Sequence, residues 1–217
     1  MTTEDFAAMT FPEMTSLRRS LSTLACKRCL DLCLALAVGL LFLPIFLVLA
    51  IAIRLDSPGP VLFIQDRRGE HFRMFRMFKF RSLHHRAPDP RAQYEMQEDD
   101  PRITRVGAFI RHTSLDELPQ LLNVILGDMS LIGPRPLVDW ESRQCLLRHG
   151  ARFLVKPGIT GLSQISVRNG VDLDDRSDKD VEYVQRWSLG LDLRILCLTP
   201  RVLISGRGIY PAPKSQG

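Results

Sequence analysis

The sequence lacks the ligand sets that build common metal and disulfide scaffolds. Of its five cysteines, Cys26 and Cys29 form a Cys-x-x-C pair, but no second such pair and no His pair completes a zinc site. The odd number of cysteines, with no visible pairing framework, argues against a disulfide-rich secreted domain and fits a reducing compartment. The fold therefore depends on an apolar core, for which 45% hydrophobic residues are enough.

A calcium-binding loop is also missing, although acidic residues cluster in the C-terminal part of the chain. The cluster has neither the glycine nor the terminal glutamate of an EF-hand loop. We predict a solvated loop here, and its acidic residues are Asp172, Asp174, Asp175, Asp178 and Asp180.

Internal repeats, long low-complexity tracts and recognised nucleic-acid-binding motifs are absent as well. A chain of 217 residues then fits one domain with at most one appended segment. The net charge of +5 suits anionic partners such as nucleic acid, lipid headgroups and phosphorylated substrates. Because no binding motif accompanies the charge, we expect no nucleic-acid partner.

Charge is missing from 22 consecutive residues, Leu32 to Ile53. About 20 apolar residues cover a bilayer core, whereas a cleaved signal peptide has a shorter apolar region; a buried core helix is the remaining alternative. Cations flank both ends of the run, so both ends are expected on the cytoplasmic side; they are Arg18, Arg19, Lys27, Arg28 and Arg54. Pro44 lies near the middle and removes a backbone hydrogen bond, which favours a broken, re-entrant helix slightly over a straight span.

A β-hairpin is predicted after this segment. Val61 to Gln65 and Phe72 to Arg81 have the composition of two strands, and a polar turn joins them. Residues 67–86 contain seven cations and one acid. A solvated face would explain the charge, but beside a membrane segment we favour a surface for phosphates or lipid headgroups. We assign Lys79 and Arg81 to substrate binding on this basis.

Two adjacent carboxylates, Asp116 and Glu117, stand just before an apolar stripe at helical spacing. One explanation is structural: Ser114 caps the helix and Glu117 completes a capping box. Gly127 is placed to end the same helix. This explanation accounts for the residue types without any catalysis.

The other explanation for this segment is catalytic. An ionised aspartate near a helix N-terminus, with cations to offset repulsion, can attack phosphorus and form an acyl phosphate. Arg111 upstream and Arg135 downstream are candidates to neutralise charge in the transition state. The residues alone leave both explanations open.

Residues 111–136 read RHTSLDELPQLLNVILGDMSLIGPRP and resemble the bacterial sugar transferase family of polyprenyl-phosphate phosphoglycosyl transferases. Further segments continue the resemblance in order: Lys27-Arg28-x-x-Asp31, Asp56 to Pro60, Gln65 to Gly69, Lys79 to Ser82, Asp100 to Thr104, Lys156 to Gly161, Arg168-Asn169, Tyr183, Trp187 to Leu189 and Asp192. Each segment is weak alone, but the ordered set is specific. One departure is Leu43-Pro44, where the family commonly has Ser-Pro at the helix break.

The resemblance implies a two-step transfer of a hexose-1-phosphate from a UDP-sugar to undecaprenyl phosphate, with release of UMP. It makes Asp116 the nucleophile that carries the phospho-aspartyl intermediate, with Glu117 helping to bind Mg²⁺ or to transfer a proton. The implied metal ligands are therefore Asp116 and Glu117. Arg111 matches a family arginine, and the segment Pro134-Arg135-Pro136 matches a loop associated with nucleotide binding.

Sequence and resemblance together predict a small α+β membrane-associated protein with a proline-broken re-entrant helix, a β-hairpin and amphipathic interfacial helices. The expected parts are a leader (1–26), the membrane-anchoring helix (27–56), a cytoplasmic catalytic domain (57–210) and a tail (211–217). It would act as a monotopic protein on the cytoplasmic face of the bacterial inner membrane, in contact with membrane lipid, and the length predicts the catalytic module alone. The oligomeric state stays open, and a homodimer is one option.

Such an enzyme would initiate exopolysaccharide or another surface glycan. Glucose and galactose are the favoured sugars, and an N-acetylated sugar is not excluded. Two alternatives remain: a membrane-bound nucleotide-sugar hydrolase, in which water replaces the lipid acceptor, and a catalytically silent membrane adaptor.

Overall fold

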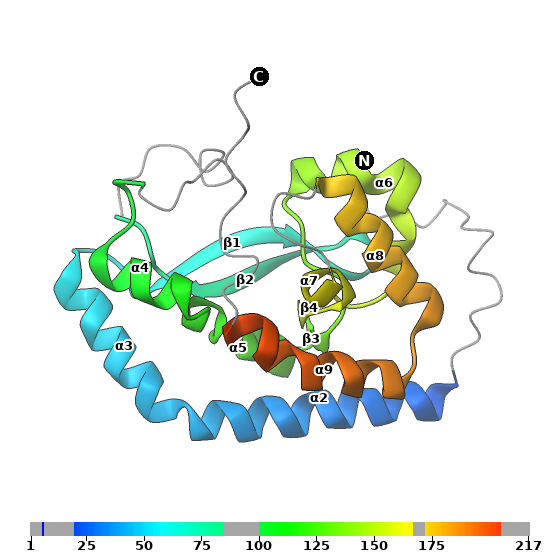
Figure 1. Ribbon diagram of the computed structural model, residues 1–217, viewed down its shortest axis with the longest axis horizontal. Helices are drawn as coiled ribbons and strands as arrows, with labels where there is room; N and C mark the ends of the chain where they lie inside the picture. The colour runs from blue at the N-terminus through cyan, green and yellow to red at the C-terminus, as the bar shows by residue number, and fades with distance from the viewer. Residues whose placement is uncertain (1–5, 7–19, 85–99, 167–171, 205–217) are drawn as a thin grey trace.

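The computed structural model describes residue 6 and residues 20–84, 100–166 and 172–204 (Figure 1). It is mostly helical with two small sheets, which confirms the predicted mixture of helices and strands. The helices, 3-10 turns (η) and strands are, in chain order, α2 (Leu21–Leu41), α3 (Leu43–Asp56), β1 (Leu62–Arg68), η2 (Glu70–Phe72), β2 (Met74–Phe80), α4 (Arg105–His112), η4 (Leu115–Glu117), α5 (Gln120–Leu126), β3 (Ser130–Ile132), α6 (Asp139–His149), η5 (Gly150–Leu154), β4 (Gly158–Thr160), α7 (Leu162–Ser166), α8 (Leu173–Arg186) and α9 (Leu189–Ile204).

The apolar run forms a bent pair of helices, α2 and α3, which lies along one side of the molecule in Figure 1. The two axes differ by 60°, and the break falls at Phe42. Pro44 is the second residue of α3, because proline fits a first helical turn but cannot continue α2. Among the described residues, no single helix is long and apolar enough to cross a membrane, but this pair together has the required length and composition. The helix is bent, as predicted, with the junction at Phe42, two residues before Pro44. Helix α2 begins at Leu21, six residues before the predicted anchor.

Both ends of the bent pair are tied to the rest of the fold. Near its start, Arg28 donates hydrogen bonds to two carbonyls of α5, Val124 O at 2.7 Å and Ile125 O at 3.1 Å. At its far end, Asp56 accepts a hydrogen bond of 2.9 Å from the N–H of Val106, in the first turn of α4. The apolar side chains between these ties are widely exposed, and they include Leu36, Leu40, Leu47, Val48 and Ile51.

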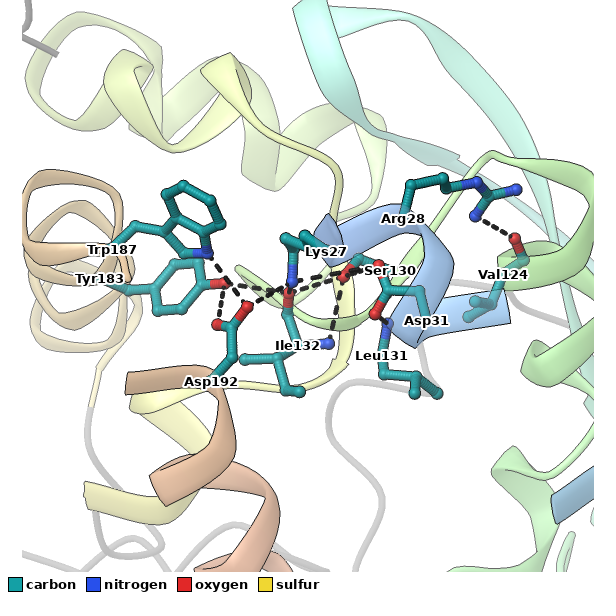
Figure 2. A network of polar contacts seen from close by, with 10 residues as sticks. All are labelled: Lys27, Arg28, Asp31, Val124, Ser130, Leu131, Ile132, Tyr183, Trp187 and Asp192. Atoms are coloured by element: carbon teal, nitrogen blue, oxygen red, sulfur yellow. Dashed lines mark hydrogen bonds and ion pairs between the residues drawn. The ribbon is translucent and has the colours of Figure 1, made fainter. Parts of the chain in front are cut away.

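Charged side chains of α2 also hold strand β3 (Figure 2). Asp31 accepts hydrogen bonds from Ser130 Oγ at 2.8 Å and from the N–H of Leu131 at 3.1 Å. Lys27 donates to Ile132 O at 3.2 Å and to Asp192 of α9 at 2.7 Å. Because β3 runs directly into residues 133–136, these contacts fix the base of that loop.

The predicted hairpin is present as the antiparallel pair β1–β2, in a register from Leu62 opposite Phe80 to Arg68 opposite Met74. Its first strand extends three residues beyond the predicted end at Gln65, and the turn lies at 69–73. Phe80 is buried against α3 and α4, so the hairpin packs on the end of the bent pair.

Strands β3 and β4 form the second sheet, and their pairing is parallel. Two glycines allow the backbones to meet beyond it: a Cβ on Gly133 would lie 2.4 Å from Lys156 O, and one on Gly158 would lie 2.1 Å from Gly133 N. Any larger residue at either position would push the loop at 133–136 out of place.

The acidic cluster is not the solvated loop we predicted but the start of a 14-residue helix, α8. Asp172 caps it by accepting from the N–H of Asp175 at 3.0 Å, and acids in a first turn complement the helix dipole. Asp180 is buried and ion-paired with Arg152, a tertiary contact that the local sequence does not reveal.

Candidate active site

The two adjacent carboxylates lie in the turn between α4 and α5. Ser114 has a left-handed backbone, with φ 56° and ψ 17°, and this reverses the chain after α4. Asp116 and Glu117 follow in η4, and Pro119 occupies the N-cap position of α5. Ser114 makes no side-chain cap hydrogen bond, so the capping-box explanation is wrong. Gly127 ends α5 with φ 96°, as predicted.

Glu117 is the firmly paired member of the two. Lys79 from β2 donates to it at 2.8 Å, and a guanidinium nitrogen of Arg135 lies 3.7 Å from the same oxygen. Burial alone would raise the pKa of Glu117, but Lys79 and Arg135 outweigh it and hold the pKa at about 2. Glu117 therefore stays ionised at all physiological pH values.

Asp116 behaves in the opposite way. Burial, together with the charge of Glu117, raises its pKa to about 6, while Lys79 and Arg111 oppose the rise. Near neutral pH the group is mostly ionised, yet it remains far more basic than an ordinary aspartate. A carboxylate that is ionised, poorly solvated and surrounded by cations is suited to attack an electrophilic phosphorus.

Arg135 is presented to the pair by a rigid loop. The flanking residues Pro134 and Pro136 are buried, whereas Arg135 is exposed. Pro134 O accepts from the N–H of Gly158 at 2.9 Å, and Pro136 O accepts from Arg67 at 3.1 Å. The two prolines thus act through their fixed backbone, and the arginine supplies the charge.

Two further predicted residues, Arg111 and Arg81, have different positions relative to the carboxylate pair. Arg111, in the last turn of α4, lies close enough to Asp116 to lower its pKa. Arg81 has a different environment: its buried guanidinium donates to the carbonyls of Pro58 at 2.7 Å, Ser57 at 2.7 Å and Ile53 at 3.3 Å. Those contacts close the C-terminal end of α3, so Arg81 joins the hairpin to the bent pair.

Arg67 belongs to the site although we did not single it out from the sequence. It lowers the pKa of Glu117, and it donates to Gln65 at 2.7 Å as well as to Pro136 O. The available signal was its place in the segment from Gln65 to Gly69. Within a basic run, however, the sequence does not say which cation faces the carboxylates.

The two carboxylates of the site are possible ligands for Mg²⁺. Among the described residues, no three His, Cys, Asp or Glu side chains form a group that could hold a metal ion. Asp116 and Glu117 supply two carboxylates, and Mg²⁺ commonly takes one or two carboxylates and completes its shell with water and substrate phosphates. The residues fit an ion that arrives with phosphate groups and do not form a closed protein cage.

A carboxylate pair ringed by cations, next to a bent apolar helix pair, is typical of a protein that handles phosphorylated substrates at a membrane surface. The chain belongs to the bacterial sugar transferase family, whose family model matches residues 22–206. The resemblance found in the sequence is thereby confirmed.

Curated relatives share about two fifths of their residues with this chain. An undecaprenyl-phosphate glucose phosphotransferase of Komagataeibacter xylinus is 42% identical over 85% of this chain and 37% of its own length. A UDP-glucose:undecaprenyl-phosphate glucose-1-phosphate transferase of Caulobacter vibrioides is 42% identical over 85% of this chain and 72% of its own length. A UDP-N-acetylgalactosamine-undecaprenyl-phosphate N-acetylgalactosaminephosphotransferase of Aeromonas hydrophila is 42% identical over 84% of this chain and 44% of its own length.

This chain therefore spans less than half the length of two of these three relatives. Their equal identity to it also means that overall similarity does not choose between glucose and N-acetylgalactosamine.

Proposed function

We propose that this chain transfers a hexose-1-phosphate from a UDP-sugar to undecaprenyl phosphate through a phospho-aspartyl intermediate on Asp116. The observation that carries the proposal is the carboxylate pair among cations, where Lys79 lies 2.8 Å and Arg135 3.7 Å from Glu117. These cations hold the pKa of Glu117 at about 2, whereas burial raises the pKa of Asp116 to about 6. The names of the relatives supply the donor and acceptor classes.

In the first step, an oxygen of Asp116 attacks the phosphorus that bears the sugar. The bond from that phosphorus to the bridging oxygen of the diphosphate breaks, and UMP leaves. Arg111 and Arg135 offset the negative charge that develops on the phosphoryl oxygens. In the second step, an oxygen of undecaprenyl phosphate attacks the same phosphorus, and Asp116 is released as a carboxylate.

Glu117 has a supporting role in this proposal. Its charge is already matched by Lys79 and Arg135, so it orients both cations toward the phosphates. Asp116 and Glu117 would hold Mg²⁺ jointly with the diphosphate, and the ion would neutralise charge on the leaving UMP. Lys79 would exchange part of its contact with Glu117 for a phosphate oxygen when the donor binds.

We propose further that the bent pair enters and leaves the membrane on the same, cytoplasmic face. Its support is that both ends bind one folded domain: Lys27 and Arg28 bind β3, α5 and α9, whereas Asp56 binds α4. A straight span would carry one of these ends to the other side. Labelling of single cysteines placed at the exposed positions Ser20 and Pro60, in a cysteine-free background, tests this: both must react from the cytoplasmic side only.

The reaction is tested by UMP release from a panel of UDP-sugars, with undecaprenyl phosphate and Mg²⁺, in protein reconstituted into lipid nanodiscs. Steady release that requires the lipid acceptor is expected with one or a few donors. Asp116→Asn should lower it about 10³-fold or more, because an amide cannot form the acyl phosphate. Asp174→Asn, which removes an exposed carboxylate of α8, is the matched control and should change nothing.

Three outcomes would contradict the proposal. Steady UMP release without the lipid acceptor would identify a nucleotide-sugar hydrolase. An Asp116→Asn variant as active as the parent would remove the intermediate from this residue. Folded, inserted protein that is silent with every donor would point to the membrane adaptor.

A further inference from the structure

A buried ion pair lies directly behind the loop that presents Arg135. Arg152 of η5 is 2% exposed and Asp180 of α8 is 1% exposed, and their side chains meet at 2.5 Å. Further side chains hold both charges: Arg152 donates to Ser177 Oγ at 2.9 Å and to Cys145 Sγ at 4.0 Å, and Ser163 Oγ donates to Asp180 at 2.7 Å. These contacts fix the pair in one orientation.

This pair holds the main chain of Arg135 on both sides. The guanidinium of Arg152 donates to Arg135 O at 2.7 Å. The main-chain amide of Arg135 also interacts with the carboxylate of Asp180, where it opposes the rise in pKa that burial causes. Only the side chain of Arg135 is left to move, and it extends toward Glu117.

Stability alone is a weak reason for such an arrangement. Removing two charges from water costs several kcal/mol, and apolar residues of similar volume often replace a buried ion pair with no loss of stability. What an apolar pair cannot do is make directional polar contacts with both the N–H and the C=O of one residue, here Arg135. The neighbouring prolines and the close contact of Gly133 with Gly158 restrict the same loop. All of these contacts therefore limit the directions in which the Arg135 side chain can extend.

We propose that Arg152 and Asp180 are positioning residues that set the direction of the Arg135 side chain toward the reacting phosphate. The inference rests on the proposed function, since it assigns Arg135 a place in that reaction. Neither residue touches the substrate. Both act through the backbone of Arg135, and a displacement of about 1 Å at a charge-stabilising group can lower a rate about a hundredfold.

A double-mutant cycle between Arg152→Lys and Arg135→Ala tests the proposal. Lysine keeps the buried positive charge but has a single nitrogen, which cannot reach Asp180, Ser177 and the carbonyl of Arg135 together. Turnover is measured per active site, with active sites counted from the burst of UMP in the absence of lipid acceptor. We expect Arg152→Lys to lower kcat about tenfold with KM for the donor nearly unchanged, and to lower it less than about twofold further when Arg135 is already alanine.

A second variant keeps the test decisive if Arg152→Lys does not fold. Ser163→Ala removes one hydrogen bond to Asp180 and leaves both charges in place; we expect about a threefold loss of kcat, again absent in the Arg135→Ala background. His149→Gln is the matched control, because His149 is equally buried and binds Asp178 of the same helix without touching Arg135. It should leave kcat per active site unchanged.

Equal losses in both backgrounds would overturn the inference, because Arg152 would then act on the fold in general. An Arg135→Ala variant with full turnover would overturn it too, since there would be nothing to position. If the parent protein releases no UMP with any donor, the proposed function itself fails, and that result is distinct from either of these.

Discussion

Two charged clusters of this chain contain the same residue types but have different roles, one in holding the fold together and one in the active site. The docking cluster, Lys27, Asp31 and Asp192, joins the bent helix pair to β3 and α9 (Figure 2). The active-site cluster, Asp116, Glu117, Lys79, Arg111 and Arg135, gathers around the turn between α4 and α5. In the docking cluster, each carboxylate accepts hydrogen bonds from more than one donor. Asp192 accepts them from Lys27 at 2.7 Å, Tyr183 at 2.7 Å and Trp187 at 3.1 Å.

The active-site cluster instead places two carboxylates side by side on the chain. Its cations favour Glu117, and Asp116 is left with a pKa of about 6. The difference teaches that charge and burial do not by themselves define a functional site. A carboxylate that accepts hydrogen bonds from several fixed donors stabilises the fold. A carboxylate that is crowded by a like charge is destabilised in its ionised form, and it is therefore more reactive.

The largest effect should come from the docking cluster. Asp192→Ala removes the acceptor of three donors, of which Tyr183 is buried and Lys27 and Trp187 are half-buried, and it leaves Lys27 without its closest partner. We therefore expect a loss of about 3 kcal/mol in the free energy of unfolding. Urea unfolding of the detergent-solubilised protein measures it. Asp174→Asn, at an exposed ion pair, is the control and should cost less than about 0.5 kcal/mol. A loss below about 1 kcal/mol for Asp192→Ala would mean that the cluster does not hold the helix pair to the domain.

A smaller effect, on rate and pH dependence, is expected from Lys79→Met in the active-site cluster. Activity of the parent should fall as the pH drops through about 6, because Asp116 then becomes protonated. Lys79 lowers the pKa of both carboxylates, so its removal should move this acid limb to higher pH and reduce kcat/KM about a hundredfold.

The measurement for Lys79→Met is kcat/KM for the donor between pH 5 and 9, taken within the range in which the protein stays folded. Lys179→Met, at a half-buried pair with Glu182 on α8, serves as the control and should leave the profile in place. An acid limb that stays fixed or moves to lower pH would show that Lys79 does not set the charge of the pair.

The features that the sequence predicted correctly are those set by local chemistry. Pro44 breaks the apolar helix because it lacks an N–H, Gly127 ends α5 because it accepts a positive φ, and alternation in the basic segment gives the hairpin. The carboxylate pair was also visible, since its two members are adjacent in the chain.

The features that were missed depend on tertiary contacts. Arg81 and Arg67 occur in one basic run, yet one closes the end of α3 and the other faces Glu117. The acidic cluster forms a helix partly because Arg152 reaches Asp180 from 28 positions away. Ser114 adopts a left-handed backbone because two helices must meet there, and its residue type does not demand it. Partners distant in sequence decide each of these outcomes.

The smallest expected effect is on the free energy of unfolding, which should change in opposite directions when Asp116 and Glu117 are replaced. In the folded protein the pKa of Asp116 is raised from 3.8 to about 6. The contribution of this group to stability is therefore fully present below pH 3.8 and is lost as the pH rises through about 6. The pKa of Glu117 is lowered from 4.5 to about 2, so its contribution to stability is present above pH 4.5 and is lost as the pH falls through about 2.

At pH 7.5, Asp116→Asn should therefore raise the free energy of unfolding by about 1 kcal/mol, and Glu117→Gln should lower it by about as much, after allowance for solvent screening. Thermal unfolding at pH 7.5 and at pH 3.5 tests this, since the gain from Asp116→Asn should nearly vanish at the lower pH. Two losses of similar size at pH 7.5 would show that both carboxylates are stabilising, and the active-site cluster would then be a second docking cluster rather than a strained one.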